Sequence, residues 1–310
     1  MTSAPLAARL RVPSGPLFFP VTPYGAEGSV DIEAFRAHVR GGVEAGAAAV
    51  FACCGTGEFH ALTPEEFQLL VTAAVEETAG RVPVIAGAGY GTALAVRYAR
   101  LAEAAGADGL LAMPPYLVVA AQEGLLRHYT ELAAATSLDV IVYQRDNAVF
   151  TPETVVEFAR ADGIIGFKDG LGDLDLMQRI VLSVRAGVSK PFQFFNGLPT
   201  AEMTQLAYRG IGVELYSSAV FCFAPEISLG FYNAVQAGDT ELVNRFLFEF
   251  YKPLVELRDK VPGYAVALVK AAVRANGLEV GGVRPPLIDP SDDHLAALDK
   301  IIAAGKALLA

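Results

Sequence analysis

The stretch Ile164-Ile165-Gly166-Phe167-Lys168-Asp169-Gly170 ends an apolar run, which predicts a buried strand, with a lysine. An ammonium group is costly to bury, so a lysine in this place requires an explanation. Burial favours the neutral amine, which is nucleophilic and is typical of lysines that form Schiff bases with carbonyl compounds. Alternatively, only the aliphatic stem is buried and the amine reaches solvent. This strand by itself does not decide between the two interpretations.

The stretch is one of eight similar apolar runs, each followed by helical sequence. The runs span residues 15–21, 48–53, 82–86, 108–112, 138–143, 163–168, 192–195 and 211–216. Two of the helical stretches open with strong start signals, Thr63-Pro64-Glu65-Glu66 and Thr151-Pro152-Glu153-Thr154. Alternating strands and helices indicate a parallel sheet, and eight units in about 235 residues predict an α/β fold, a closed (β/α)8 TIM barrel. A doubly wound open sheet is the alternative, which the unbroken alternation disfavours.

Helical sequence continues beyond the eighth unit, over residues 240–257, 264–276 and 292–309. No low-complexity linker separates these helices from the preceding units. We therefore expect a barrel over residues 1–237 and a helical C-terminal extension over residues 238–310, packed on the barrel as a single structural unit.

The composition disfavours several classes of partner. The chain has 310 residues and a formal net charge of −10, which disfavours binding to nucleic acid or to an anionic membrane surface. No uninterrupted apolar run reaches the length of about 18 residues that a membrane span needs, and residues 1–13 lack the apolar core of a signal peptide. Cys53, Cys54 and Cys222 form neither a disulfide framework nor a zinc-ligand spacing. We expect a cytoplasmic protein with no nucleic acid or membrane partner.

In a TIM barrel, catalytic groups lie at the C-terminal ends of the strands and in the loops that follow. At these positions the sequence places small or polar residues, namely Gly55, Thr56, Gly57, Tyr143, Arg145, Lys168, Asn196, Gly197, Ser217 and Ser218. Tyr143 and Lys168 end neighbouring strands, so a phenol is expected beside the amine, where it relays protons. Gly55-Thr56-Gly57 offers backbone N–H groups and a hydroxyl to a carboxylate. The set predicts covalent amine catalysis on a 2-oxo acid.

Other polar features favour structural interpretations. Glu58-Phe59-His60 has no second cluster to complete a metal site, so we expect no metal, and Glu58 is expected to serve its own loop. Gly87-Ala88-Gly89-Tyr90-Gly91-Thr92 follows a strand, but its third glycine comes one place too early for a dinucleotide fingerprint. Glu214 lies inside the predicted eighth strand and is a candidate for facing the cavity and contacting substrate.

The segments Gly55-Thr56-Gly57-Glu58 and Gly166-Phe167-Lys168-Asp169-Gly170, with Tyr143, resemble the signature positions of the dihydrodipicolinate synthase/N-acetylneuraminate lyase superfamily. The resemblance runs from Phe19-Pro20-Val21-Thr22-Pro23 to the C-terminal helices. It implies a (β/α)8 fold, a Schiff-base lysine at Lys168, a proton-relay tyrosine at Tyr143 and usually a homotetramer, with a dimer as the alternative.

Within the superfamily, three segments look most like the 5-dehydro-4-deoxyglucarate dehydratase branch. These are Gly55-Thr56-Gly57-Glu58-Phe59, Tyr143-Gln144-Arg145-Asp146-Asn147-Ala148 and Tyr216-Ser217-Ser218-Ala219-Val220-Phe221. The dihydrodipicolinate synthase branch has two consecutive threonines where this chain has Gly55-Thr56, and a tyrosine pair where it has Tyr116-Leu117. The resemblance thus favours the dehydratase and puts in doubt a relay through a second tyrosine of a neighbouring subunit.

The implied reaction converts 5-dehydro-4-deoxy-D-glucarate to 2,5-dioxopentanoate, water and carbon dioxide, and it needs no metal or organic cofactor. The implied partner is a small 2-oxo sugar diacid, whose two carboxylates require two anion sites. We assign the keto-end carboxylate to Gly55-Thr56-Gly57. Candidates for the distal carboxylate are Arg145, Asn196, Ser217 and Ser218. The alternatives are a pyruvate-dependent class I aldolase or dihydrodipicolinate synthase-like enzyme, and a non-catalytic sugar-acid-binding barrel.

Overall fold

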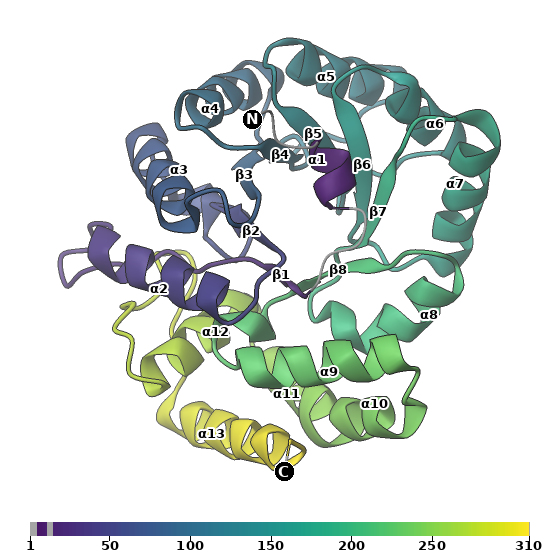
Figure 1. Ribbon diagram of the computed structural model, residues 1–310. Helices are drawn as coiled ribbons and strands as arrows, with labels where there is room; N and C mark the ends of the chain where they lie inside the picture. Colours follow the sequence, from purple (N-terminus) through teal and green to yellow (C-terminus); the bar gives the residue numbers. More distant parts are fainter. Residues whose placement is uncertain (1–4, 11–14, 310) are drawn as a thin grey trace.

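The computed structural model describes residues 5–10 and 15–309, and its centre is a closed barrel of parallel strands (Figure 1). The strands follow one another around the barrel in chain order, and the first pairs with the eighth. Their bounds are β1 Leu17–Phe18, β2 Ala49–Ala52, β3 Val84–Ala88, β4 Gly109–Ala112, β5 Asp139–Gln144, β6 Ile164–Asp169, β7 Gln193–Asn196 and β8 Leu215–Ser218. The predicted TIM barrel is confirmed, and the open-sheet alternative is wrong. Most of segment 1–13, which is predicted to lack a signal peptide, lies outside the described residues.

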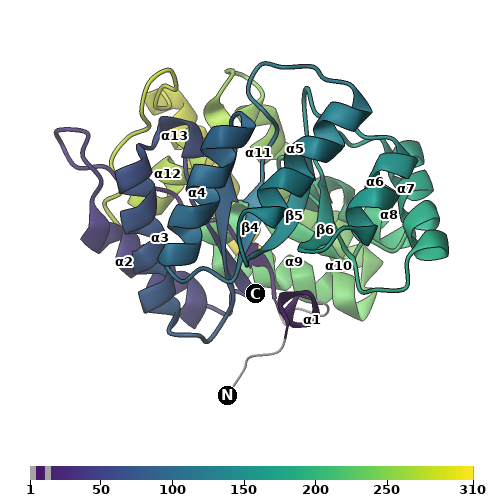
Figure 2. The ribbon, with the colours of Figure 1, turned by 90° about the horizontal axis from the view of Figure 1, so that it is seen from above.

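A helix follows each strand and lies on the outside of the barrel (Figures 1 and 2). The helices are α2 Ile32–Glu44, α3 Pro64–Thr78, α4 Thr92–Ala104, α5 Gln122–Ala134, α6 Pro152–Arg160, α7 Leu174–Gly187, α8 Gln205–Gly210 and α9 Pro225–Ala237. Both predicted start signals are confirmed. Thr63 and Glu66 form a capping box at α3, and the Thr151 side chain accepts the Thr154 N–H at the start of α6.

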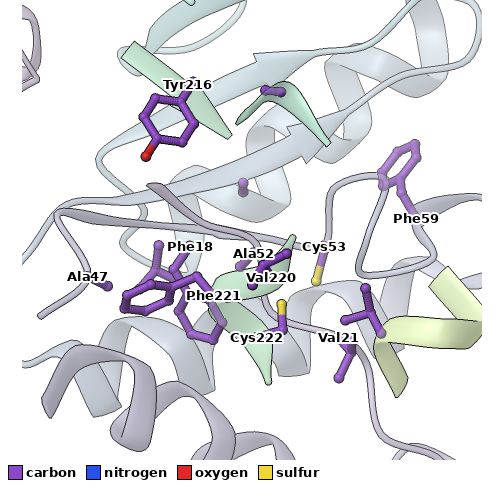
Figure 3. Packing of buried hydrophobic residues seen from close by; sticks show 14 of the residues in the cluster. Phe18, Val21, Ala47, Ala52, Cys53, Phe59, Tyr216, Val220, Phe221 and Cys222 are labelled. Carbon is purple, nitrogen blue, oxygen red and sulfur yellow. The ribbon is translucent and has the colours of Figure 1, made fainter. Parts of the chain in front are cut away.

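Strand side chains divide between two cores because successive residues of a strand point to opposite faces. Leu17, Phe51 and Ile85 point into the barrel. Phe18 points outwards and packs against Phe221, their ring centroids 5.5 Å apart in the core between the barrel and its helices (Figure 3). This alternation decides which strand-end residues reach the interior.

A short helix, not predicted from the sequence, closes the N-terminal end of the barrel. This is α1 Leu6–Arg9, whose Leu6 joins the interior core together with Leu10 (Figure 2). Arg9 forms an ion pair of 2.5 Å with Asp108, which immediately precedes β4. Because apolar side chains seal this end, the interior is reached from the C-terminal ends of the strands.

Strand β8 begins later than predicted, which changes the position of three residues. Glu214 precedes the strand, is exposed and pairs with Arg209 at 3.5 Å. The expectation that Glu214 lies inside the strand and faces the cavity is therefore wrong. Ser217 and Ser218 belong to the strand itself and not to the loop after it.

The C-terminal extension is helical, as predicted. It consists of α10 Thr240–Phe246, a π-helical turn Leu247–Tyr251, α11 Lys252–Arg258, α12 Tyr264–Ala275 and α13 Asp292–Ala307. Helices α10 and α13 pack on α9 of the barrel, and α12 contacts the turn Val220–Cys222 after β8 (Figure 1). In the described ranges 5–10 and 15–309, no helix has the length and apolar character to cross a membrane.

Candidate active site

The direction of the Lys168 side chain depends on a skipped residue in β6. Adjacent residues of β5 pair with Ile164 and Gly166, so that Ile165 is passed over. A β-bulge of this kind reverses the alternation of the side chains beyond it. Ile164 and Phe167 lie in the outer core, whereas Lys168 points into the barrel. With strict alternation from Ile164, the lysine would face the surrounding helices.

The Lys168 amine lies between two aromatic rings. Its Nζ is 4.5 Å from the ring centre of Phe19 and 4.4 Å from that of Tyr143. The residue is only 6% exposed, so its amine does not extend into bulk solvent. Burial lowers the pKa of Lys168 from 10.5 to about 8; Arg145 acts in the same direction, and Cys54 opposes both. Burial therefore increases the share of neutral, nucleophilic amine near neutral pH.

Tyr143 stands opposite Lys168 in the β5–β6 ladder, so the structure brings together the expected phenol and amine. The Tyr143 hydroxyl donates a hydrogen bond of 2.9 Å to the Gly197 carbonyl oxygen. Arg145 donates to the same hydroxyl at 3.5 Å. Burial raises the pKa of Tyr143, and the neighbouring Arg145 opposes that rise by favouring the phenolate. The phenol thus has a proton acceptor and a cation within reach.

Two glycines make room for this pair. A β-carbon at Gly197 would lie 2.6 Å from both Cγ and Cε of Lys168. A β-carbon at Gly170 would lie 2.9 Å from the Tyr143 hydroxyl oxygen. A larger residue at either position would push the reacting side chain out of place.

Lys168 and Tyr143 line a cavity of about 360 Å³ at the C-terminal end of the barrel. Arg145 and Arg258 also line it, and no Asp or Glu side chain of the described residues does. The cavity is therefore locally positive within a chain whose formal net charge is −10. A site of this charge and size fits a small anion.

Several of the predicted substrate-binding residues line this cavity, but Gly57 does not. Gly55, Thr56, Gly197 and Ser217 are part of the lining. Gly57 is buried behind it, and its carbonyl oxygen accepts a 2.6 Å hydrogen bond from the Thr22 hydroxyl. The loop after β2 therefore presents Gly55 and Thr56 to the cavity, while Gly57 anchors it.

Asn196 and Ser218 lie outside the cavity, contrary to the expectation that they contact substrate. Both are fully buried and point towards the outer helices. The Asn196 amide donates to the Ala201 carbonyl oxygen at 3.0 Å. The Ser218 hydroxyl donates to the Glu202 carboxylate at 2.6 Å. The alternation of side chains explains the difference, since each follows an inward-facing residue of its strand.

Glu58 has a structural role, as expected, but its side-chain partners lie in the C-terminal extension and not in its own loop. Its carboxylate pairs at 3.0 Å with Lys270 of α12, and both side chains are completely buried. The other carboxylate oxygen accepts the backbone N–H of Arg284 at 2.9 Å. This carboxylate is fully engaged and holds the loop of Thr56 against the C-terminal extension. Across ranges 5–10 and 15–309, no cluster of three or more His, Cys, Asp or Glu side chains is arranged to hold a metal ion.

The C-terminal extension contributes to the cavity, which the sequence patterns do not predict. Leu254 and Arg258 of α11, and Val266 and Val269 of α12, form part of its lining. No strand end or glycine motif marks these positions, and their helical pattern predicts only packing. Their role depends on how the extension folds back over the barrel mouth.

Residues 13–305 match the model of the Dihydrodipicolinate synthetase family, which covers most of the chain. The chain belongs to this family. The predicted resemblance to the superfamily is thereby confirmed. Among solved structures of similar fold is dihydrodipicolinate synthase from Bacillus clausii, with a TM-score of 0.88 and 25% identity. The match covers 97% of this chain and 100% of that one.

Two relatives are much more similar in sequence than this solved structure. A protein of Streptomyces avermitilis, named probable 5-dehydro-4-deoxyglucarate dehydratase 1, is 72% identical over 100% of this chain and 99% of its own. A protein of Streptomyces coelicolor with the same name is 71% identical over 100% of this chain and 98% of its own.

Proposed function

We propose that the protein is a lyase that converts 5-dehydro-4-deoxy-D-glucarate to 2,5-dioxopentanoate, water and carbon dioxide through a Schiff base on Lys168. The observation that carries this proposal is the buried Lys168 amine, 4.4 Å from the Tyr143 ring centre in a cavity lined by cations. Full-length relatives of 71–72% identity bear the name of this enzyme, which supports the choice of substrate.

The first step is attack of the neutral amine on the ketone carbon, followed by loss of water to give an iminium ion. With a pKa of about 8 for Lys168, roughly one tenth of the amine is neutral at pH 7. An unperturbed lysine would be neutral in only about 0.03% of molecules at that pH. Burial therefore supplies a several-hundred-fold gain in reactive amine.

Tyr143 relays protons in this step. Its ring centre lies 4.4 Å from the amine and its hydroxyl donates to the Gly197 carbonyl oxygen, so the phenol is oriented before substrate arrives. Arg145 stabilises the phenolate form while the proton is transferred. The carbinolamine hydroxyl receives that proton and departs as water.

The iminium then acts as an electron sink. It acidifies the adjacent CH2, whose proton is removed to give an enamine, and the enamine expels the β-hydroxyl as water. The conjugated iminium that results accepts the electron pair of the bond to the distal carboxylate, which leaves as carbon dioxide and gives a dienamine that carries an enol. Uptake of one proton and tautomerisation of the enol to the aldehyde then give an imine. Hydrolysis of the remaining imine releases 2,5-dioxopentanoate and regenerates Lys168. No metal or organic cofactor enters the sequence of steps.

We assign the keto-end carboxylate to the loop of Gly55, Thr56 and Gly57, in which Gly55 and Thr56 line the cavity. Ser217 and Arg145 are proposed as further substrate contacts, since both line the same cavity. Asn196 and Ser218 are removed from the set, because their side chains are engaged elsewhere.

We also propose a cytoplasmic homo-oligomer, a tetramer or a dimer, in which a second copy of the chain covers an apolar loop after β4. Tyr116, Leu117, Val118 and Val119 are consecutive and between 54% and 83% exposed, which is unusual for a monomer surface. The three cysteines are buried and free, which suits a reducing compartment. The cavity wall formed by α11 and α12 supports a single structural unit of barrel and extension.

Borohydride reduction tests the proposed function. The protein is mixed with 5-dehydro-4-deoxyglucarate or with pyruvate, reduced, and analysed by peptide mass spectrometry. We expect an adduct on Lys168 from the sugar diacid, with the mass left after loss of water and carbon dioxide. An adduct from pyruvate alone would indicate an aldolase. Binding of the sugar diacid with no adduct on Lys168 from either compound would indicate a non-catalytic barrel.

A further inference from the structure

The cavity contains a cation that the reaction described above does not use. This is Arg258, the last residue of α11 in the C-terminal extension. We propose that Arg258 binds the distal carboxylate of the substrate and so selects 2-oxo diacids over 2-oxo monoacids. This inference rests on the proposed function and names the residue that recognises the second charge.

Two nitrogens of the Arg258 guanidinium donate hydrogen bonds within the protein, and the third is available to a ligand. Its Nη1 donates to the Pro199 carbonyl oxygen at 3.0 Å and to the Thr200 hydroxyl at 2.9 Å. Its Nε donates to Asp259 at 2.8 Å, and the Asp259 side chain is 60% exposed. Within the described ranges, Nη2 has no hydrogen-bond partner. Because an exposed carboxylate neutralises a cation only weakly, Arg258 keeps a charge and a donor available for a ligand.

The position of Arg258 relative to Lys168 suits a six-carbon substrate. Gly197 packs directly on the Lys168 side chain, and Pro199, which Arg258 contacts, is two residues further along. Two residues span at most about 7 Å of backbone. In the proposed substrate, the ketone carbon and the distal carboxylate carbon are four single bonds apart, about 5 Å when extended. A substrate joined to Lys168 can therefore place its far end beside this loop.

Arg145, the other arginine of the cavity, serves the reacting end instead. Its Nη1 lies 3.5 Å from the Tyr143 hydroxyl oxygen, close to the amine. The keto-end carboxylate is assigned to the loop of Gly55 and Thr56. The three positive or anion-binding groups thus have separate tasks, and Arg258 is the one on the side of the extension.

A single available nitrogen also suits the chemistry of the distal carboxylate. This group leaves as carbon dioxide and must lose its charge in the transition state. Two parallel hydrogen bonds from a guanidinium would stabilise the charged ground state and oppose that loss. One contact from Nη2 gives recognition with a weaker hold. The product retains only the keto-end carboxylate, so it cannot make this contact, and its release is favoured.

Two acids of equal length test the proposal. 2-Oxoadipate carries a carboxylate at the position of the substrate's distal group, and 2-oxohexanoate carries a methyl group there. We expect calorimetry to show that the wild-type protein binds 2-oxoadipate about 10- to 100-fold more tightly, the range for a hydrogen bond to a charged group. Arg258→Gln should remove this preference and leave the affinity for 2-oxohexanoate unchanged. Arg245→Gln, which alters an exposed arginine of α10 paired with Glu249, is the matched control and should keep the wild-type ratio.

Three results would overturn the proposal. The first is a ratio near one in the wild type, and the second is a ratio that Arg258→Gln leaves unchanged. The third is an equal loss of affinity for both acids, which would mean that Arg258 only holds the loop of Pro199 and Thr200. Arg258→Lys retains the charge and should keep part of the preference; it carries the test if Arg258→Gln does not fold. Borohydride treatment of the same mixtures reports on the Schiff base separately, so that a failure of the diacid preference is distinguished from a failure of the Schiff base.

Discussion

Gly197 and Lys168 are packed so closely that a single β-carbon at residue 197 would lie 2.6 Å from both Cγ and Cε of the lysine. The same glycine accepts the hydrogen bond of the Tyr143 hydroxyl. One residue after β7 therefore sets the place of the amine and the orientation of the phenol. This explains why the loop after β7 has to carry a residue without a side chain.

Gly197→Ala should displace the Lys168 amine and lower kcat/KM by about 100-fold, since a misplacement of about 1 Å at a reacting group has effects of this size. Borohydride trapping on Lys168 should slow, and the thermal unfolding temperature should also fall, because the β-carbon would lie 2.9 Å from the Asp169 carbonyl oxygen. Gly91→Ala is the matched control, because Gly91 has a φ of −72° and open space around its α-carbon. Wild-type activity in Gly197→Ala would show that the lysine adapts freely.

Lys168→Met should make the protein more stable while it abolishes trapping. The folded-state pKa of Lys168, about 8, lies below its ordinary value of 10.5. Folding therefore opposes the charged form, and this cost is fully present below pH 8 and declines as the pH rises towards 10.5. We expect a gain of about 3 kcal/mol at pH 7 and about 1 kcal/mol at pH 10. Urea unfolding of both proteins at the two pH values measures the difference; an equal gain at both would contradict the assignment of the cost to ionisation.

Lys270→Met should destabilise the protein by about 3–5 kcal/mol, because it leaves the buried Glu58 carboxylate without its cation. Lys270 also donates to the Thr22 carbonyl oxygen at 2.8 Å, so the change loosens the loop that carries Thr56. The KM for substrate should rise several-fold as a result.

The double variant Lys270→Met/Glu58→Gln provides the comparison for this prediction. It removes both charges and keeps an oxygen to accept the backbone N–H of Arg284. Chemical unfolding should show that it recovers part of the lost stability. If the single and double variants are equally unstable, the buried charge is not the cause.

Ser217→Ala should weaken substrate binding, whereas Ser218→Ala should lower stability, although the two residues are adjacent. Ser217 lines the cavity, so its loss should raise KM and leave stability nearly unchanged. Ser218 donates to Glu202, a buried carboxyl group whose pKa burial raises to about 7 and Ser218 holds down. Ser218→Ala should raise that pKa further and cost about 1–3 kcal/mol of stability, with KM unchanged. Steady-state kinetics and thermal unfolding of both variants test this; a similar KM effect in both would mean that Ser218 reaches the substrate.

Much of the fold follows from patterns that act locally along the chain. The alternation of apolar runs and helices predicted the closed barrel, and the capping residues Thr63 and Thr151 marked two helix starts. Glu214 lies outside the strand because the apolar run from residue 211 begins before hydrogen bonding to β7 does. Helix α1 cannot be predicted from the sequence, because four residues carry too little periodicity.

The sequence by itself determined the barrel, the family and the presence of Lys168 at a strand end, because these depend on periodicity and on short motifs. Only the tertiary structure decided which way the strand-end residues face. The skipped Ile165 turns Lys168 inwards, whereas unbroken alternation turns Asn196 and Ser218 outwards. It also brought Arg258 to the cavity from a distant helix. The direction of a strand side chain depends on the register in which the strand pairs with its neighbours, and proximity across the fold depends on packing. Neither can be predicted from the local sequence.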